Sequence, residues 1–226
     1  MQKPILLRTR SYKGDYMNTT DTILLIKLIA KDIEANKEYL TELDTAIGDA
    51  DHGINLSRGF SAVDKKLEEA TNLNTPGDVL KTTAMTLIST VGGASGPLYG
   101  TLFIKMAGAL KEEEITLSGF CDALDIGIEG VKARGRAVAG EKTMLDVLIP
   151  VLDSLKGALE NGVSGKEAFE EALIKAKEGY EYTKSIVATK GRASYLGERS
   201  LGHIDPGCMS SYLMLKAVSE FLAGRR

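Results

Sequence analysis

The chain has 226 residues, 43% of them hydrophobic, and 28 Lys plus Arg against 31 Asp plus Glu give it a formal net charge of −3. This length suits one domain with a sizeable core, and the charge balance argues against a nucleic-acid or anionic-membrane binder. No apolar run approaches the roughly 20 residues of a membrane span, and two cysteines without metal-ligand spacing, Cys121 and Cys208, favour a reduced, cytoplasmic protein.

Residues 1–16 carry no helical period and a local excess of positive charge, and a second Met stands at position 17. We expect this stretch to be an extension outside the fold, with the domain over 17–226. A native arm that docks on a partner is the alternative. From Thr20 to Leu43, apolar residues recur with a helical period and predict the first helix.

A polar turn, LDTAIGDADHGIN, follows that helix and holds Asp44, Asp49, Asp51 and His52. Carboxylates held close together raise one another's pKa unless a cation or hydrogen-bond donors neutralise them. Oxygen ligands of this kind favour Mg²⁺ or Ca²⁺, although the spacing fits neither an EF-hand nor a P-loop. Metal binding is one reading of the three aspartates, and helix capping or turn formation is the other. His52 is open to a capping reading as well.

The next helices are predicted over 60–67 and 79–87, with a break at Asn74-Thr75-Pro76-Gly77 between them. A glycine-rich run, VGGASGPLYG, leads into a helical pattern over 102–110. Small residues at a helix start let backbone N–H groups approach an anion, so the run predicts a phosphate site. Tight packing between helices through Gly and Ala explains the same residues equally well.

Four further helices complete the pattern. One covers 120–131 and stops at Arg134-Gly135, and one covers 144–155 with Pro150 expected to kink or divide it. A capping box at 164–167 opens the seventh, and the eighth covers 209–221. Because no segment alternates with period two for long enough to suggest a sheet, we predict an all-α domain of about eight helices.

A long glycine-rich segment over 188–207 separates the last two helices, and it carries Lys190, Arg192 and Arg199. Cations of this kind neutralise a transferring phosphoryl group, and the glycines would allow the segment to close over a ligand. Pairing of these cations with helix-end carboxylates is the less favoured alternative. His203 is expected to brace the segment rather than to act in catalysis.

Together, the carboxylate cluster, the glycine-rich helix start and the cationic segment predict a magnesium–nucleotide site built without a P-loop. The strings LDTAIGDADHGIN, VGGASGPLYGT, RGRAVAGEKTMLDV and ATKGRASYLGERSLGHIDPG occur in this order. With them the chain resembles the L subunits of phosphotransferase-system-dependent dihydroxyacetone kinases from about residue 20 onward.

This resemblance implies an eight-helix barrel with a nucleotide site at one end. It implies that Asp44, Asp49 and Asp51 bind two Mg²⁺ ions and that Arg192 contacts the phosphates and the transferring group, as the catalytic residue. The other nucleotide-binding residues that it implies are His52, Gly53, Ile54, Asn55, Ala94 and Ser95 near the phosphates, and Gly135, Met144, Asp205, Pro206 and Gly207 near the base and ribose.

The resemblance also implies a phosphotransferase in which ADP stays bound as a coenzyme. A phosphohistidine on an M subunit would phosphorylate this ADP, and the γ-phosphoryl group would pass to dihydroxyacetone held by a K subunit. A homodimer and a heterotetramer with K are both open, as is the acceptor sugar. The alternatives are an ATP-using nucleotide-binding subunit of a related kinase and an ADP-form-specific partner of a transcriptional regulator.

Overall fold

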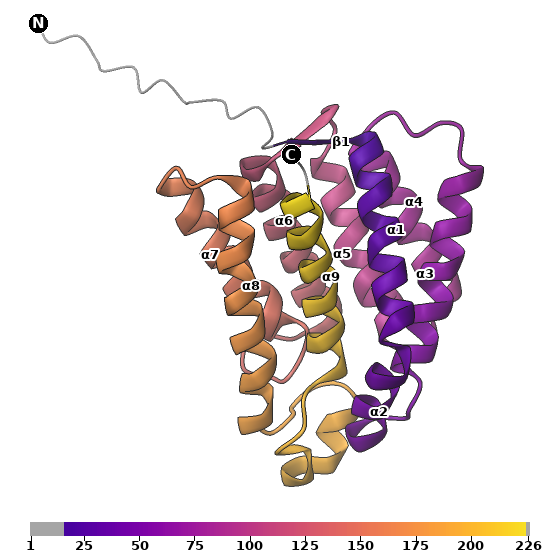
Figure 1. Cartoon of the computed structure of the whole chain (residues 1–226). Coiled ribbons are helices and arrows are strands. Elements are labelled where there is room, and N and C mark those ends of the chain that lie inside the picture. Colours follow the sequence, from indigo (N-terminus) through magenta and orange to yellow (C-terminus); the bar gives the residue numbers. More distant parts are fainter. Residues whose placement is uncertain (1–15, 225–226) are drawn as a thin grey trace, which may run out of the picture.

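The computed structural model describes residues 16–224, which form nine α-helices, two 3₁₀ helices and two short strands (Figure 1). Residues 1–15 of the predicted extension lie outside the described residues. In chain order the elements are β1 Tyr16–Asn18, α1 Thr19–Ala35, α2 Lys37–Ile47, α3 His52–Glu69, α4 Pro76–Thr90, α5 Ser95–Ala109, β2 Glu114–Thr116, α6 Leu117–Gly135, α7 Leu145–Glu160, α8 Gly165–Tyr182, η1 Thr183–Ser185, η2 Arg192–Ser200 and α9 Pro206–Gly224.

Eight of the helices form a closed ring. Each of α3 to α9 packs on the next along the chain, α9 packs on α1, and α1 packs on α3 to complete the circle (Figure 1). One cluster of buried apolar side chains fills the interior of this barrel. The predicted all-α, eight-helix barrel is therefore confirmed. Within residues 16–224, no helix combines the length and the apolar character that a membrane crossing requires.

The first predicted helix is two helices, because the chain breaks at Asn36. The Asn36 amide and its side-chain Nδ2 both donate to the carbonyl of Asp32, at 3.1 and 2.8 Å, which ends α1. The helix α2 then lies outside the ring and contacts α3, α9 and η2. Hydrophobic periodicity missed this break, since the buried Leu40 continues the apolar pattern of α1.

Pro150 does not divide α7, which runs unbroken from Leu145 to Glu160. A proline cannot donate a backbone hydrogen bond to the carbonyl four residues earlier, here that of Asp146. The backbone of α8 approaches this carbonyl at Gly179, where an added Cβ would overlap it. The helix continues past the proline, so of the kink or division that we predicted, the division does not occur.

A small antiparallel ladder, which the sequence pattern did not reveal, joins β1 to β2. Tyr16 pairs with Thr116, and Asn18 pairs with Glu114. Strands of three residues are too short to show an alternating pattern. The ladder lies at the end of the barrel opposite α2 (Figure 1), and it includes Tyr16, the last residue of the predicted extension.

Candidate active site

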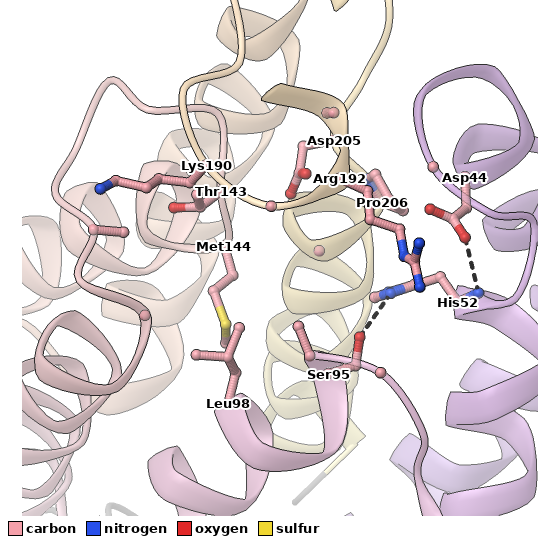
Figure 2. Close-up of a pocket in the computed structure, with 18 of the residues that line it drawn as sticks. Asp44, His52, Ser95, Leu98, Thr143, Met144, Lys190, Arg192, Asp205 and Pro206 are labelled. Carbon is pink, nitrogen blue, oxygen red and sulfur yellow. Dashed lines mark hydrogen bonds between the residues drawn. The ribbon is translucent and has the colours of Figure 1, made fainter. Parts of the chain in front are cut away.

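A cavity of about 520 Å³ opens at the end of the barrel near α2. Its walls come from the C-terminal ends of α2 and α6, the N-terminal ends of α3, α5, α7 and α9, and the segment around Arg192 (Figure 2). N-terminal helix ends present unpaired N–H groups and a positive dipole end to a ligand. The barrel therefore directs several favourable anion-binding elements into one cavity.

Asp44, Asp49 and Asp51 come together at this cavity. Each offers one carboxylate oxygen, and these oxygens all lie within 4.8 Å of one another. Ala50 has the left-handed backbone conformation (φ 61°), which turns the chain sharply between the second and third aspartates. The donor set consists of oxygen alone, which is the chemistry that hard divalent cations prefer.

The structure separates the metal-binding and helix-capping interpretations of this acidic turn residue by residue. Oδ2 of the buried Asp44 accepts hydrogen bonds from the backbone N–H groups of Asp51 and His52, at 2.9 and 3.1 Å. Asp44 thus caps the start of α3. Asp51, although it stands at the N-cap position, makes no side-chain cap. The capping reading therefore holds for one oxygen of Asp44 and does not account for Asp51.

Arg192 extends into the cavity from the start of η2 (Figure 2). Its Nη2 lies 2.8 Å from Oδ2 of Asp49, with both side chains partly exposed. Lys190 makes a longer contact with Glu141, at 3.9 Å. The cationic segment and the acidic turn, which lie more than 130 residues apart in the chain, therefore face each other across one cavity.

His52 is buried at the start of α3 and is held from two sides. Its Nδ1 lies 3.0 Å from the hydroxyl of Ser95 (Figure 2). Its Nε2 lies 2.9 Å from the hydroxyl of Ser210. Burial lowers the pKa of His52 to about 4, while Asp44 opposes this shift. The imidazole is therefore neutral and connects the α5 and α9 walls of the cavity.

Two glycines of the glycine-rich run have different structural settings. Gly93 has φ 65° and open space around it, beside the cavity-lining Ala94 and Ser95. A Cβ on Gly96, in contrast, would overlap the carbonyl oxygen of Val91. The left-handed backbone beside the cavity thus accounts for Gly93, and close packing accounts for Gly96.

The opposite wall of the cavity is mostly apolar. Leu98, from α5, and Met144, just before α7, approach each other there (Figure 2), beside Gly135. Asp205, Pro206 and Gly207 form the wall at the start of α9. Withdrawal from water raises the pKa of Asp205 to about 7, even though its carboxylate accepts a hydrogen bond from the Cys208 N–H. An apolar wall with a few polar groups at its edge suits a nucleoside.

Three of the residues that the resemblance implied do not line the cavity. Gly53 packs against the α2 backbone, and Ile54 is 47% exposed in a separate surface depression beside α2. The side chain of Asn55 accepts a hydrogen bond from Arg58, at 2.7 Å. Successive helix residues point about 100° apart, so a contiguous motif cannot turn every side chain towards one cavity. The other implied residues do line it.

Sequence reasoning missed four buried polar residues near the site. The Tyr99 hydroxyl lies 2.6 and 2.9 Å from the hydroxyls of Ser210 and Ser211, and 3.0 Å from the carbonyl oxygen of Gly207. Lys142 is buried with its ammonium on backbone carbonyls. Tyr99 and Lys142 lie inside the sequence strings quoted above, and this position could have marked them as site residues. Ser210 and Ser211 lie outside those strings, and no sequence signal marked them. Arg199 and His203 are exposed and do not line the cavity.

Comparison with known proteins shows the family of this chain. A family model, the DAK2 domain, matches residues 46–220. The chain is 46% identical over 188 residues to the "PEP-dependent dihydroxyacetone kinase 1, ADP-binding subunit DhaL" of Listeria innocua, covering 83% of this chain and 89% of that protein. It is 48% identical over 183 residues to the corresponding ADP-binding subunit DhaL of Escherichia coli, covering 80% and 87%.

Two solved structures share the fold. The native dihydroxyacetone kinase of C. freundii superposes with a TM-score of 0.71 at 23% identity, over 97% of this chain and 37% of that chain. The same kinase in complex with AMP-PNP and Mg²⁺ gives a TM-score of 0.69 at 21% identity, over the same shares. At these identities the likeness shows the fold, and the family model and the sequence relatives show the family. The chain belongs to the DAK2 domain family.

Proposed function

We propose that this chain is the nucleotide-binding subunit of a phosphoenolpyruvate-dependent dihydroxyacetone kinase. ADP would remain bound as a coenzyme, accept a phosphoryl group from a phosphohistidine carrier subunit, and pass it to dihydroxyacetone on a K subunit. One observation carries the proposal: the acidic turn, the start of α5 and Arg192 all face the same cavity. Relatives that cover most of this chain are named as ADP-binding subunits of such kinases.

The acidic turn fits a magnesium site. Its three converging carboxylate oxygens form a hard donor set, and Arg192 is the cation that contacts Asp49 in this structure. We propose that Asp44, Asp49 and Asp51 hold two Mg²⁺ ions. When bound, these ions supply positive charge to the diphosphate and to the transferring phosphoryl group. Asp44 would bind magnesium through the same carboxylate that caps the start of α3.

The remaining residues would bind and orient the nucleotide. The backbone N–H groups at Ala94 and Ser95 can contact phosphate oxygens, and His52 holds the Ser95 hydroxyl in place. The wall of Leu98 and Met144 would cover the base, with Asp205, Pro206 and Gly207 beside the ribose. We also propose that Gly53, Ile54 and Asn55 support the phosphate side through the backbone of α3, because their side chains point elsewhere.

Arg192 is the proposed catalytic residue. In the first transfer, the P–N bond of the phosphohistidine breaks as a β-phosphate oxygen of ADP forms a new P–O bond. In the second transfer, the bond between the β–γ bridging oxygen and the γ-phosphorus of the resulting ATP breaks and ADP stays bound. A hydroxyl oxygen of dihydroxyacetone forms the new P–O bond and releases its proton to water. A guanidinium stabilises the charge on the transferring group in such steps. Arg192 would leave Asp49 and contact the transferring group instead, since its partly exposed ion pair with Asp49 is weak.

This function requires two protein partners in the same compartment, which we propose is the cytoplasm. Both partners must reach the mouth of one cavity, so they would bind one after the other. The proposal is tested by purifying the chain without added nucleotide, denaturing it, and quantifying the released nucleotide before and after incubation with labelled ATP. About one ADP per chain without label supports the coenzyme role. An empty site, or one that fills with labelled ATP, contradicts it.

A further inference from the structure

Lys142 is a buried cation that the proposed function leaves without a role. The residue is 1% exposed and stands just before Thr143 and Met144 in the cavity wall. Burial lowers the pKa of this lysine, and Asp205 opposes the shift. Among residues 16–224 its ammonium has no ion-pair partner, and its hydrogen bonds go to backbone carbonyls instead.

Those carbonyls lie at the two ends of the segment that carries Arg192. The Lys142 Nζ donates to the carbonyl of Thr183, at 2.7 Å, before the segment, and to that of Ser200, at 2.5 Å, after it. A longer contact, at 3.4 Å, reaches the carbonyl of Ile186. One ammonium thus joins the two ends of residues 187–199 to the wall that carries Met144.

Neighbouring hydrogen bonds tighten the same junction. The Gly202 N–H donates to the carbonyl of Lys184, at 2.8 Å, and the Ala188 N–H donates to the hydroxyl of Ser200, at 2.9 Å. Past this junction, the segment also contacts the rest of the site through Thr189 and Lys190 on Glu141, and through Arg192 on Asp49. Ala188, Ala193 and Leu196 pack with Ile47 of α2. The partly exposed ion pairs among these contacts hold a chain weakly. The junction therefore fixes the two ends of the segment, while its middle rests on the packing against α2.

We propose that Lys142 is a positioning residue for phosphoryl transfer, which holds the Arg192 segment against the nucleotide wall. The inference rests on the proposed function for its chemistry, although the pinning itself is a property of the fold. Moving an ammonium out of water costs free energy, and a neutral apolar residue would avoid that cost. A charge is useful here because an ammonium carries three donors on one atom, and these can hold carbonyls from both ends of the segment.

The first test needs no activity. Lys142→Met should speed amide hydrogen exchange in residues 187–203 by about tenfold or more, because local opening governs that exchange. Exchange in α3 and α4 should stay unchanged. The matched control is Lys184→Met, which removes a half-exposed lysine at the same junction whose partner is Glu181. Unchanged exchange in the segment would overturn the pinning, whatever the protein's activity.

The second test is a double-mutant cycle with Arg192→Ala, read as transfer to dihydroxyacetone in the presence of both partner subunits. A displacement of about 1 Å can cost roughly a hundredfold in rate. Lys142→Met should therefore slow transfer by about tenfold or more in the wild-type background and by about twofold or less in the Arg192→Ala background. Equal losses in both backgrounds would make Lys142 purely structural and overturn the proposal.

Two further results distinguish a folding defect, or a failure of the proposed function, from a failure of the Lys142 proposal. If Lys142→Met does not fold, Lys142→Arg enters the same cycle, since it keeps the charge and the donors but not their geometry. It should lose transfer while keeping the native circular dichroism spectrum, and full transfer would overturn the proposal. If the wild-type chain transfers no phosphoryl group with its partners, the proposed function fails, and the hydrogen-exchange result alone decides whether Lys142 pins the segment.

Discussion

Nη2 of Arg192 lies 2.8 Å from Oδ2 of Asp49. The proposed catalytic cation therefore contacts one of the proposed metal ligands. On binding of magnesium and nucleotide, the carboxylate would gain a stronger partner and the guanidinium would become free to contact phosphate. Each residue can thus be tested separately, because we expect removal of the carboxylate to affect retention of the metal and nucleotide, and removal of the guanidinium to affect transfer.

Asp49→Asn should weaken retention of magnesium and ADP while leaving the helical fold intact. The substitution removes one of three converging carboxylates, and the expected loss of affinity is on the order of tenfold to a hundredfold, as for other changes around metal sites. Bound ADP per purified chain and circular dichroism measure the two effects. Asp153→Asn, at an exposed position of α7, is the matched control. Undiminished ADP in Asp49→Asn would refute the metal assignment.

Arg192→Ala should lower the transfer rate much more than ADP retention. Loss of one donor to a developing charge costs about a hundredfold or more in rate, while the exposed contact with Asp49 adds little to binding. Single-turnover transfer and released ADP separate the two quantities. Arg199→Ala serves as the control, since Arg199 lies on the same segment but outside the cavity. Wild-type turnover in Arg192→Ala would remove this residue from the mechanism.

The different settings of Gly93 and Gly96 predict different costs of substitution. Gly96→Ala should destabilise the fold by about 1–3 kcal/mol through overlap with the Val91 carbonyl. Gly93→Ala should cost about 1–2 kcal/mol for its left-handed conformation alone. Gly157→Ala, on α7 with open space around it, should instead stabilise by roughly 0.5–1 kcal/mol. Urea denaturation without nucleotide checks all three, and a neutral Gly96→Ala would contradict the packing role.

His52 should be found with its proton on Nε2. We expect the Ser210 hydroxyl to donate its single hydrogen to the carbonyl of Pro206, at 3.0 Å, and so to accept from His52. The Ser95 hydroxyl then donates to Nδ1. Nitrogen-15 NMR of the imidazole rings is well suited to this test, because the chain has only two histidines. His203→Gln assigns the second ring, and a spectrum with Nδ1 protonated would disprove the arrangement.

Asp205 should make the nucleotide-free protein less stable as the pH rises. Its pKa is about 7 in the folded state against an ordinary value of 3.8, so the folded protein binds this proton more tightly. Between about pH 4 and pH 7 the unfolded chain binds fewer protons, and stability falls as pH rises through this window. Asp205→Asn keeps an oxygen for the Cys208 N–H and cannot ionise. The difference in urea midpoint between variant and wild type should therefore grow from pH 5 to pH 8, and parallel curves would contradict this account.

The sequence predicts the fold well because the barrel helices are long and amphipathic, and most are bounded by recognisable breaks such as the one before Pro76. It does not reveal the break at Asn36, where the apolar period continues unchanged across two helices. The ladder of Tyr16 with Thr116 was equally hidden. Three-residue strands and one-residue helix breaks are smaller than the window that a periodic pattern needs.

The sequence predicts which stretches of the chain form the candidate site, but not the contacts between their side chains. The aspartates, the glycine-rich run and Arg192 stood out because their chemistry is concentrated in short stretches. The hydrogen bond of His52 with Ser210 spans 158 positions, and no local pattern reports such a pair. Ile54 shows the opposite limit, since a motif carried over as a block includes side chains that the helix turns away from the cavity.

The β1–β2 ladder has a practical consequence for work with this protein. It places Tyr16 at the end of the barrel opposite α2 and the cavity, where the C-terminal end of α9 also lies (Figure 1). A fluorophore, an affinity handle or a surface tether joined beyond either position would hang from the far end of the barrel. A chain immobilised in this way would present the mouth of its cavity to solution. The binding of each partner could then be timed separately on the same molecule.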